Sequence, residues 1–242
     1  MTRILLSLFI ASLLAGCSSS GFPMTDEFAA NNRNSAFTYK GFDMNLLDCL
    51  DYHVSKCDVA STSVIDEVTR PGIILKGESV RSDIEEVNIR FASPSDTTRI
   101  SYHRERRYLY HGRSATESVI NLFSKDKHPQ HTSEVTLSDQ LTGSFYASSD
   151  TAQGIASFTI RNVTQKDSLA GSLKIGDDTY ILKPVGQNGN FRGMQLLKGD
   201  MMCAAIKSSF MGFDRIYVTT KLSAREQQLI AGYLVLIERY WQ

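Results

Sequence analysis

Apolar and polar residues alternate in short runs over most of the middle of the chain. From about residue 73 to residue 220, runs rich in branched and aromatic side chains are separated by Gly, Asn, Asp, Ser and Pro. This spacing is typical of an antiparallel sandwich or barrel. We therefore expect a mainly β domain, either an antiparallel sandwich or a partly open barrel.

The clearest unit of this pattern is a hairpin predicted over 168–184. One face of its first strand carries apolar residues at even spacing, namely Leu169, Leu173 and Ile175. Gly176 supplies the positive φ that the turn requires. A second turn leads into a further run at 191–197, so the pattern predicts a meander of at least three antiparallel strands.

A different periodicity predicts a helix over 223–241. Ser223 and Glu226 have the spacing of a capping box, in which each side chain accepts from the backbone amide of the other. The residues that follow form a wide apolar stripe, made of Leu229, Ile230, Tyr233, Leu234, Ile237, Tyr240 and Trp241. We expect this amphipathic helix to pack on the sheet.

A second, shorter helix is expected over 43–54. Its apolar positions recur at helical spacing, at Leu46, Leu47, Leu50 and Val54. Asp43 precedes them as an N-cap. The sequence thus predicts one domain over 37–242, with a short N-terminal helix, a β body and a C-terminal helix.

Residues 1–16 have the layout of a secretory signal peptide. Arg3 precedes an apolar run that is too short to span a bilayer. The run ends in Leu14-Ala15-Gly16-Cys17, which resembles the lipobox of bacterial lipoproteins. The resemblance implies that Cys17 is the first mature residue and carries a diacylglyceryl thioether and an N-acyl chain. The resemblance thus implies that the protein binds the membrane through the acylated Cys17.

The residues after Cys17 bear on localisation. Ser18 resembles the sorting signal for the outer membrane, which implies a lipid-anchored protein that faces the periplasm, with display on the cell surface as the alternative. Residues 17–36 are polar and rich in turn formers, and we expect them to form the anchor and a flexible tether.

Composition narrows the range of partners. The chain has 26 basic and 26 acidic residues. This balance argues against a general nucleic-acid-binding protein, which is usually distinctly basic. After the signal peptide, no second apolar run approaches the roughly 18 residues that span a bilayer.

Three cysteines remain besides Cys17, so one of them is left over if a disulfide forms. A bridge between Cys49 and Cys57 would close a short loop. If residues 45–57 formed one continuous helix, these two would lie about 12 Å apart, whereas a disulfide needs Cα atoms within about 7 Å. A bridge from either of them to Cys203, and no bridge at all, are the alternatives.

No catalytic motif and no cofactor motif is present, so we assign no catalytic residue and no cofactor. His128 and His131 lie three positions apart in a predicted loop. Imidazole groups are metal ligands, so this pair is a weak candidate for a metal site. Two solvated histidines are the simpler interpretation, and we predict no metal.

One basic and aromatic cluster lies between Arg99 and His111. Its candidate binding residues are Arg99, Arg104, Arg106, Arg107, Tyr108 and Tyr110. Guanidinium groups suit phosphates and carboxylates, so the cluster is a candidate site for a lipopolysaccharide or cell-wall anion or for an envelope protein. A sheet edge that basic residues protect from pairing is the simpler interpretation. Ion pairs between these arginines and neighbouring carboxylates would weaken the binding interpretation.

A local resemblance concerns residues 157–186. The strands around Gly171 and the run Tyr180–Pro184 look like the non-catalytic N-terminal region of secreted bacterial zinc peptidases. The chain lacks the zinc-binding helix of that family, so no catalytic residue carries over. The resemblance implies a propeptide-like β module that covers another protein.

Three hypotheses for function follow. The preferred one is a non-enzymatic binding or assembly module, lipid-anchored at the outer membrane. The second is a propeptide-like or inhibitory module that acts on a periplasmic or secreted enzyme. The third is an envelope hydrolase. An exposed apolar patch or an unpaired strand edge would favour the binding module, whereas titratable groups clustered in a deep pocket would favour the enzyme.

Overall fold

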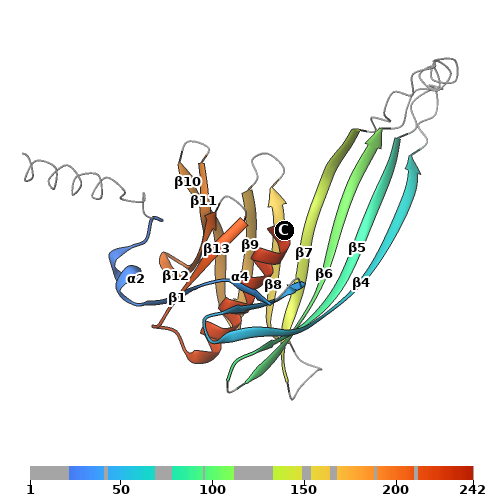
Figure 1. Ribbon diagram of the computed structural model, residues 1–242. Coiled ribbons are helices and arrows are strands. Elements are labelled where there is room, and N and C mark those ends of the chain that lie inside the picture. The colour runs from blue at the N-terminus through green and yellow to red at the C-terminus, as the bar shows by residue number, and fades with distance from the viewer. Residues whose placement is uncertain are drawn as a thin grey trace, which may run out of the picture.

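The computed structural model describes residues 22–40, 43–68, 78–94, 96–111, 133–148, 154–163, 168–187, 190–209 and 212–241. These residues form one antiparallel sheet of 13 strands and two helices (Figure 1). The first part of the sheet consists of β1 Asn32–Ala36, β2 Thr38–Lys40, β3 Asp43–Cys49, β4 Tyr52–Val68, β5 Glu78–Ala92, β6 Thr97–His111 and β7 Ser133–Ala147. The second part consists of β8 Gly154–Val163, β9 Ser168–Ile175, β10 Asp178–Gln187, β11 Asn190–Lys198, β12 Met201–Ser209 and β13 Gly212–Thr219. The helices are α2 Asp26–Ala30 and α4 Ala224–Trp241.

The N-terminal strands nearly close the sheet into a barrel. From β2 to β13 each strand pairs with the next one along the chain. β1 pairs with β13 at the far end of this meander, whereas β2 pairs with β3 at its beginning. Only Phe37 separates β1 from β2, so a single segment joins the two ends of the sheet. The expected mainly β fold is confirmed in its barrel-like form.

Helix α4 lies within the curve of the sheet. Every residue from Gln228 to Glu238 is buried. More residues are buried than the predicted apolar stripe contains, because the helix is covered on all sides. Such burial is expected for a helix that is apolar all round. The hydroxyl of Tyr233 donates to the carbonyl of Thr159 in β8 at 2.9 Å. Gly171 permits this approach, since a Cβ there would lie 2.4 Å from the Tyr233 hydroxyl.

The predicted capping box begins this helix. The backbone amide of Ser223 donates to Glu226 Oε2 at 2.9 Å, and the amide of Glu226 donates to Ser223 Oγ at 3.3 Å. Tyr180 in β10 donates to the other carboxylate oxygen at 3.0 Å. The hydrogen bond from the Ser223 side chain is the main cause that lowers the pKa of Glu226.

The predicted meander over 168–197 is also confirmed. β9 and β10 form the hairpin, with Gly176 at a φ of 59° in the turn. β11 follows as the third strand.

The prediction of a helix over 43–54 is wrong. The segment forms β3 and the start of β4, joined by a tight turn in which Leu50 has a φ of 53°. The buried residues alternate along the two strands, as Leu47, Cys49, Tyr52 and Val54. A short apolar run satisfies the helical and the strand period equally well, and pairing between the strands decides the outcome.

The expected tether is shorter than predicted. Residues 26–36 form α2 and β1 rather than a flexible segment. Phe28 is buried on the outer face of the sheet, where it packs against Met202 and Ala205. Backbone pairing with β13 orders this polar stretch, although its composition is that of a loop.

The burial of α4 predicts a large cost for truncating its side chains. Leu234 is 0 % exposed, so Leu234→Ala should lower the free energy of unfolding by about 2–5 kcal/mol. Ile181→Ala is the matched control, because Ile181 is 41 % exposed and should change stability by about 0.5 kcal/mol or less. Urea unfolding measures both, and equal losses would contradict a buried helix.

The capping box predicts a pH-dependent contribution to stability. Ser223→Ala should cost about 1 kcal/mol at pH ~7, whereas Ser223→Thr should cost less. The pKa of Glu226 is lowered in the folded state. Its ionised form therefore stabilises the fold above its unfolded pKa of about 4.3, and this contribution is lost as pH falls through the lower folded value. Urea unfolding should show a smaller Ser223→Ala cost at pH ~2.5, and a cost that grows on acidification would contradict the assignment.

Candidate functional site

Four long strands extend beyond the part of the sheet that surrounds α4 (Figure 1). The last buried side chains on their inner face are Val87 of β5, Tyr102 of β6 and Leu141 of β7. Beyond these positions the side chains of β4–β7 are half-buried or exposed. We call this projecting part of β4, β5, β6 and β7 the blade.

The inner face of the blade carries ion pairs. Arg104 donates to both carboxylate oxygens of Asp139, at 3.0 and 2.8 Å, and its guanidinium lies 4.3 Å from the centre of the Tyr240 ring. Arg106, the next inner-face residue along β6, forms an ion pair with Glu85 of β5. Each of these two arginines therefore has a carboxylate partner, and Arg104 also fastens the C-terminal end of α4 to the sheet.

The predicted basic cluster is divided by the alternation of β6. Arg104, Arg106 and Tyr108 share the inner face, whereas Arg99 and Arg107 point to the outer face. The guanidinium of Arg99 lies 4.8 Å from the centre of the Tyr146 ring. The side chain of Tyr110 lies outside the described residues. The structure does not gather these residues into one site, and the two ion pairs weaken the hypothesis of an anion site.

A cavity of about 310 Å³ lies at the C-terminal end of α4. Its lining residues are Arg104, Arg106, Asp139, Asn162, Leu169, Tyr240 and Trp241. The charged groups in this lining are the paired ones, so we interpret the cavity as part of the junction between helix and sheet.

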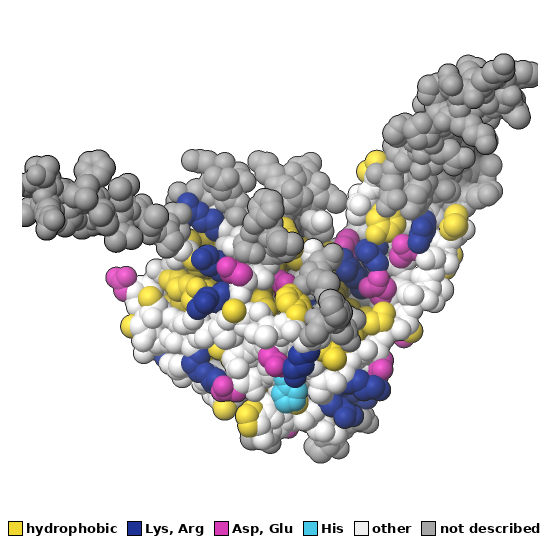
Figure 2. All heavy atoms as spheres, viewed as in Figure 1, with side chains coloured by type: hydrophobic (Ala, Val, Ile, Leu, Met, Phe, Trp, Pro, Cys, Tyr) yellow, Lys and Arg dark blue, Asp and Glu magenta, His cyan; other side chains and the backbone are white. Residues whose placement is uncertain are grey.

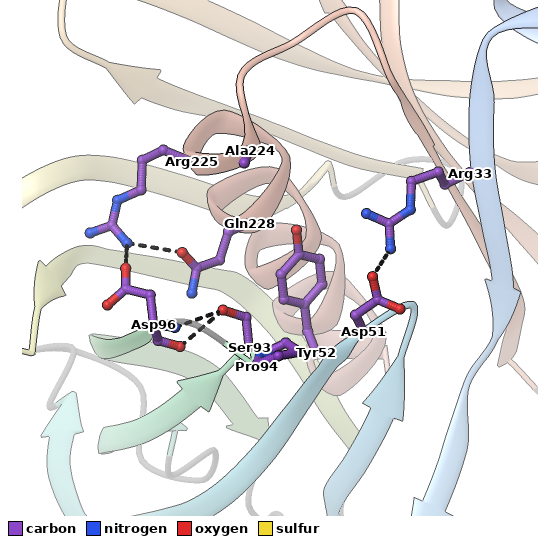
Figure 3. A pocket seen from close by; sticks show the side chains of 9 residues that line it. All are labelled: Arg33, Asp51, Tyr52, Ser93, Pro94, Asp96, Ala224, Arg225 and Gln228. Carbon is purple, nitrogen blue, oxygen red and sulfur yellow. Dashed lines mark hydrogen bonds and ion pairs between the residues drawn. The ribbon is translucent and has the colours of Figure 1, made fainter.

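A second cavity, of about 400 Å³, lies where α4 enters the barrel (Figure 3). Arg225 extends from the first turn of α4 to Asp96, while Arg33 forms an ion pair with Asp51 at the other side of the cavity. Arg225 also donates to Gln228 Oε1 at 2.9 Å. The two guanidinium–carboxylate pairs join the helix to the β5–β6 turn and β1 to the β3–β4 turn, which holds this end of the barrel together.

The described part of the chain contains no group of three His, Cys, Asp or Glu side chains that could hold a metal ion. His128 and His131 lie outside the described residues, as does Cys17. Among the described helices, none is long and apolar enough to cross a membrane.

The β4 edge of the blade is unpaired among the described strands. β3 pairs with β4 only at Asp48–His53 and Cys49–Tyr52, whereas β5 pairs with β4 along its other side as far as Val68. Beyond Val54, the edge of β4 that faces away from β5 therefore presents a row of backbone N–H and C=O groups without a strand partner in the described chain.

The lower part of this edge carries two protective features. A register shift between Val54 and Lys56 interrupts the pairing with β5, and Lys56 forms an ion pair with Asp58 at 2.7 Å. Bulges and charges of this kind discourage the addition of a further strand.

The segment Val59–Ile65 has neither feature, and we call it the docking edge. It contains no charged residue, no proline and no glycine, and it spans about 23 Å at roughly 3.3 Å per residue. Val59 is 53 % exposed and Ile65 is 65 % exposed. β7 also extends beyond β8, but that run contains Glu134 and Asp139. The sequence signal for the docking edge was a charge-free β-branched stretch, which the sequence analysis did not single out.

Comparison with known proteins assigns no family, because no family model, no curated protein and no solved structure matches the chain. Residues 157–186 form β8, β9 and β10, and their resemblance to zinc-peptidase N-terminal regions stays a prediction.

The predicted disulfide is absent among the described cysteines. Cys49 is opposite Tyr52 in the β3–β4 pair, and Cys57 lies farther along β4, roughly 16 Å away at the usual rise of a strand. This separation exceeds the reach of a disulfide. Cys203 lies in β12 and is likewise a free thiol.

Burial predicts slow reaction of two of these thiols. Burial raises the pKa of Cys49 to about 12 and also raises the pKa of Cys203. In a Cys17→Ala chain, both should resist a thiol reagent at pH ~8 until the protein unfolds, whereas the partly exposed Cys57 should react first. Unfolding without reductant should then release all three thiols, and a shortfall of two would show that a disulfide exists.

Proposed function

We propose that the protein is a lipid-anchored, non-enzymatic binding module at the outer membrane. In this proposal Cys17 carries the acyl chains, and the docking edge of β4 receives an extended segment of an envelope protein. The proposal rests on the edge of β4 over Val59–Ile65, which contains no charged residue and has no strand partner in the described chain. An unpaired edge of this kind binds peptides by strand addition, in which backbone hydrogen bonds provide the affinity.

The side chains beside the edge define the chemistry of the partner segment. Val59 is opposite the buried Val87, so it lies on the inner face together with Ser61, Ser63 and Ile65. The outer face carries Ala60, Thr62 and Val64. A complementary strand would therefore place apolar side chains beside Val59 and Ile65 and small or polar ones between them.

The edge is already ordered before a partner arrives. β4 pairs with β5 along the whole docking edge, and β5 pairs with β6 over its full length. A preordered strand loses little conformational entropy on binding, so more of the hydrogen-bond and side-chain energy contributes to affinity.

Charges placed on the docking edge test this proposal. Ser61→Lys together with Thr62→Lys puts one charge on each face of the edge, where it should oppose strand addition. Asn88→Lys together with Ser144→Lys is the matched control, because it adds the same charge to strands that are paired on both sides. In-cell crosslinking followed by purification should recover a stoichiometric partner with the parent and the control, and at least about tenfold less with the edge variant.

Two results would overturn the proposal. Equal recovery with the edge variant would exclude the docking edge, and a parent protein recovered alone would exclude a binding module. The lipid anchor is tested separately in a Cys17→Ala strain, which should move the protein from the membrane to the aqueous fraction.

A further inference from the structure

The described chain begins on the outer face of the sheet. Phe22 stacks on Tyr217 of β13, with ring centroids 6.5 Å apart and an interplanar angle of 9°. The carbonyl of Pro23 accepts a hydrogen bond from the side-chain amide of Gln195 at 2.7 Å. Gly193 leaves room for the ring, since a Cβ there would come within 2.8 Å of Phe22. These contacts fix the place from which the chain continues toward Cys17.

The distance from this place to the predicted lipid anchor is short. Only residues 18–21 separate Phe22 from Cys17. At no more than about 3.6 Å per residue, the two Cα atoms lie at most roughly 18 Å apart. If the acyl chains of Cys17 are inserted in a bilayer, the outer face of the sheet around Phe22 therefore stays next to the lipid headgroups.

The same face carries basic side chains around Phe22. Lys183 is the register partner of Gln195, and Lys207 is the register partner of both Gly193 and Arg215. Lys183 and Arg215 are exposed. Figure 2 shows Lys and Arg side chains on this side of the molecule, where α2 lies in Figure 1.

The charges of this group are largely uncompensated. None of the three basic residues has an ion-pair partner within the described ranges, and Arg215 donates to the side-chain oxygen of Asn34 at 2.9 Å. Asp214, which precedes Arg215, is also exposed. The group as a whole therefore keeps a positive formal charge.

We propose that Lys183, Lys207 and Arg215 form a membrane-facing surface that binds the anionic phosphates of lipid headgroups. The proposal rests on the lipid anchor of the proposed function and adds the face on which the domain lies. Basic side chains near an anionic bilayer attract it over about one Debye length. The blade lies on the opposite side of the molecule from α2 (Figure 1), so the docking edge would point away from the membrane.

Vesicle binding of the unacylated chain tests this surface. A chain with Cys17→Ala and no signal peptide is mixed at low salt with phosphatidylcholine vesicles that contain roughly one-third phosphatidylglycerol. Substituting Lys183, Lys207 and Arg215 together by Ser should weaken binding roughly 100-fold. The matched control substitutes Lys56, Arg90 and Arg107 by Ser. It removes the same charge from β4, β5 and β6, away from the proposed surface, and this variant should bind like the parent.

Equal weakening in both variants would show that only net charge matters and would overturn the proposal, as would a parent that does not bind. A second readout uses the acylated protein in the same vesicles, where Lys183 and Lys207 should be protected from an amine-reactive reagent that modifies Lys56. Modification of all three at equal rates would also overturn it. Failure of the lipid anchor is distinguishable, because it appears as an unmodified Cys17 in the mass of the mature N-terminus.

Discussion

Helix α4 is buried on all sides from Gln228 to Glu238, and this burial determines the course of the sheet. A helix of this kind cannot rest on an open sheet, because half of its apolar surface would remain in water, and each buried aliphatic side chain contributes roughly 1.5–3 kcal/mol. The sheet must therefore curve around the helix. The twelve strands of the meander, β2 to β13, provide the length, and the segment from β1 to β2 provides the closure.

The polar groups of α4 lie where they secure this arrangement. Glu226 joins the first turn to β10 through Tyr180. Near the other end, Glu238 is 2 % exposed and accepts hydrogen bonds from the Phe213 amide at 3.1 Å and from the Tyr39 hydroxyl. Phe213 belongs to β13 and Tyr39 to β2. One buried carboxyl group thus links the helix to strands on both sides of the closure, and a buried polar group is tolerated only with such partners.

The sequence predicted the parts of the fold that local patterns determine. The capping box of α4 and the turn at Gly176 both act within a few residues, so their signals are read directly. The strands over 43–54 were missed because their four apolar residues fit the helical period as well as the strand period. β1 was missed because its polar residues take their order from β13, which lies far away in the chain. The docking edge escaped for a related reason, since whether a strand has a neighbour is a property of the whole sheet.

The docking edge follows from a mismatch of lengths. α4 has 18 residues and is about 27 Å long at 1.5 Å per residue. β4 has 17 residues and reaches roughly 55 Å at the rise of a strand. Even when the strands tilt, the helix covers only part of their inner face. Beyond its end no apolar side chain can be buried, so the sequence places ion pairs such as Arg106–Glu85 there. The same excess length carries β4 past the end of β3 and leaves its edge open, so the feature that supports a binding function is a direct consequence of long strands around a short helix.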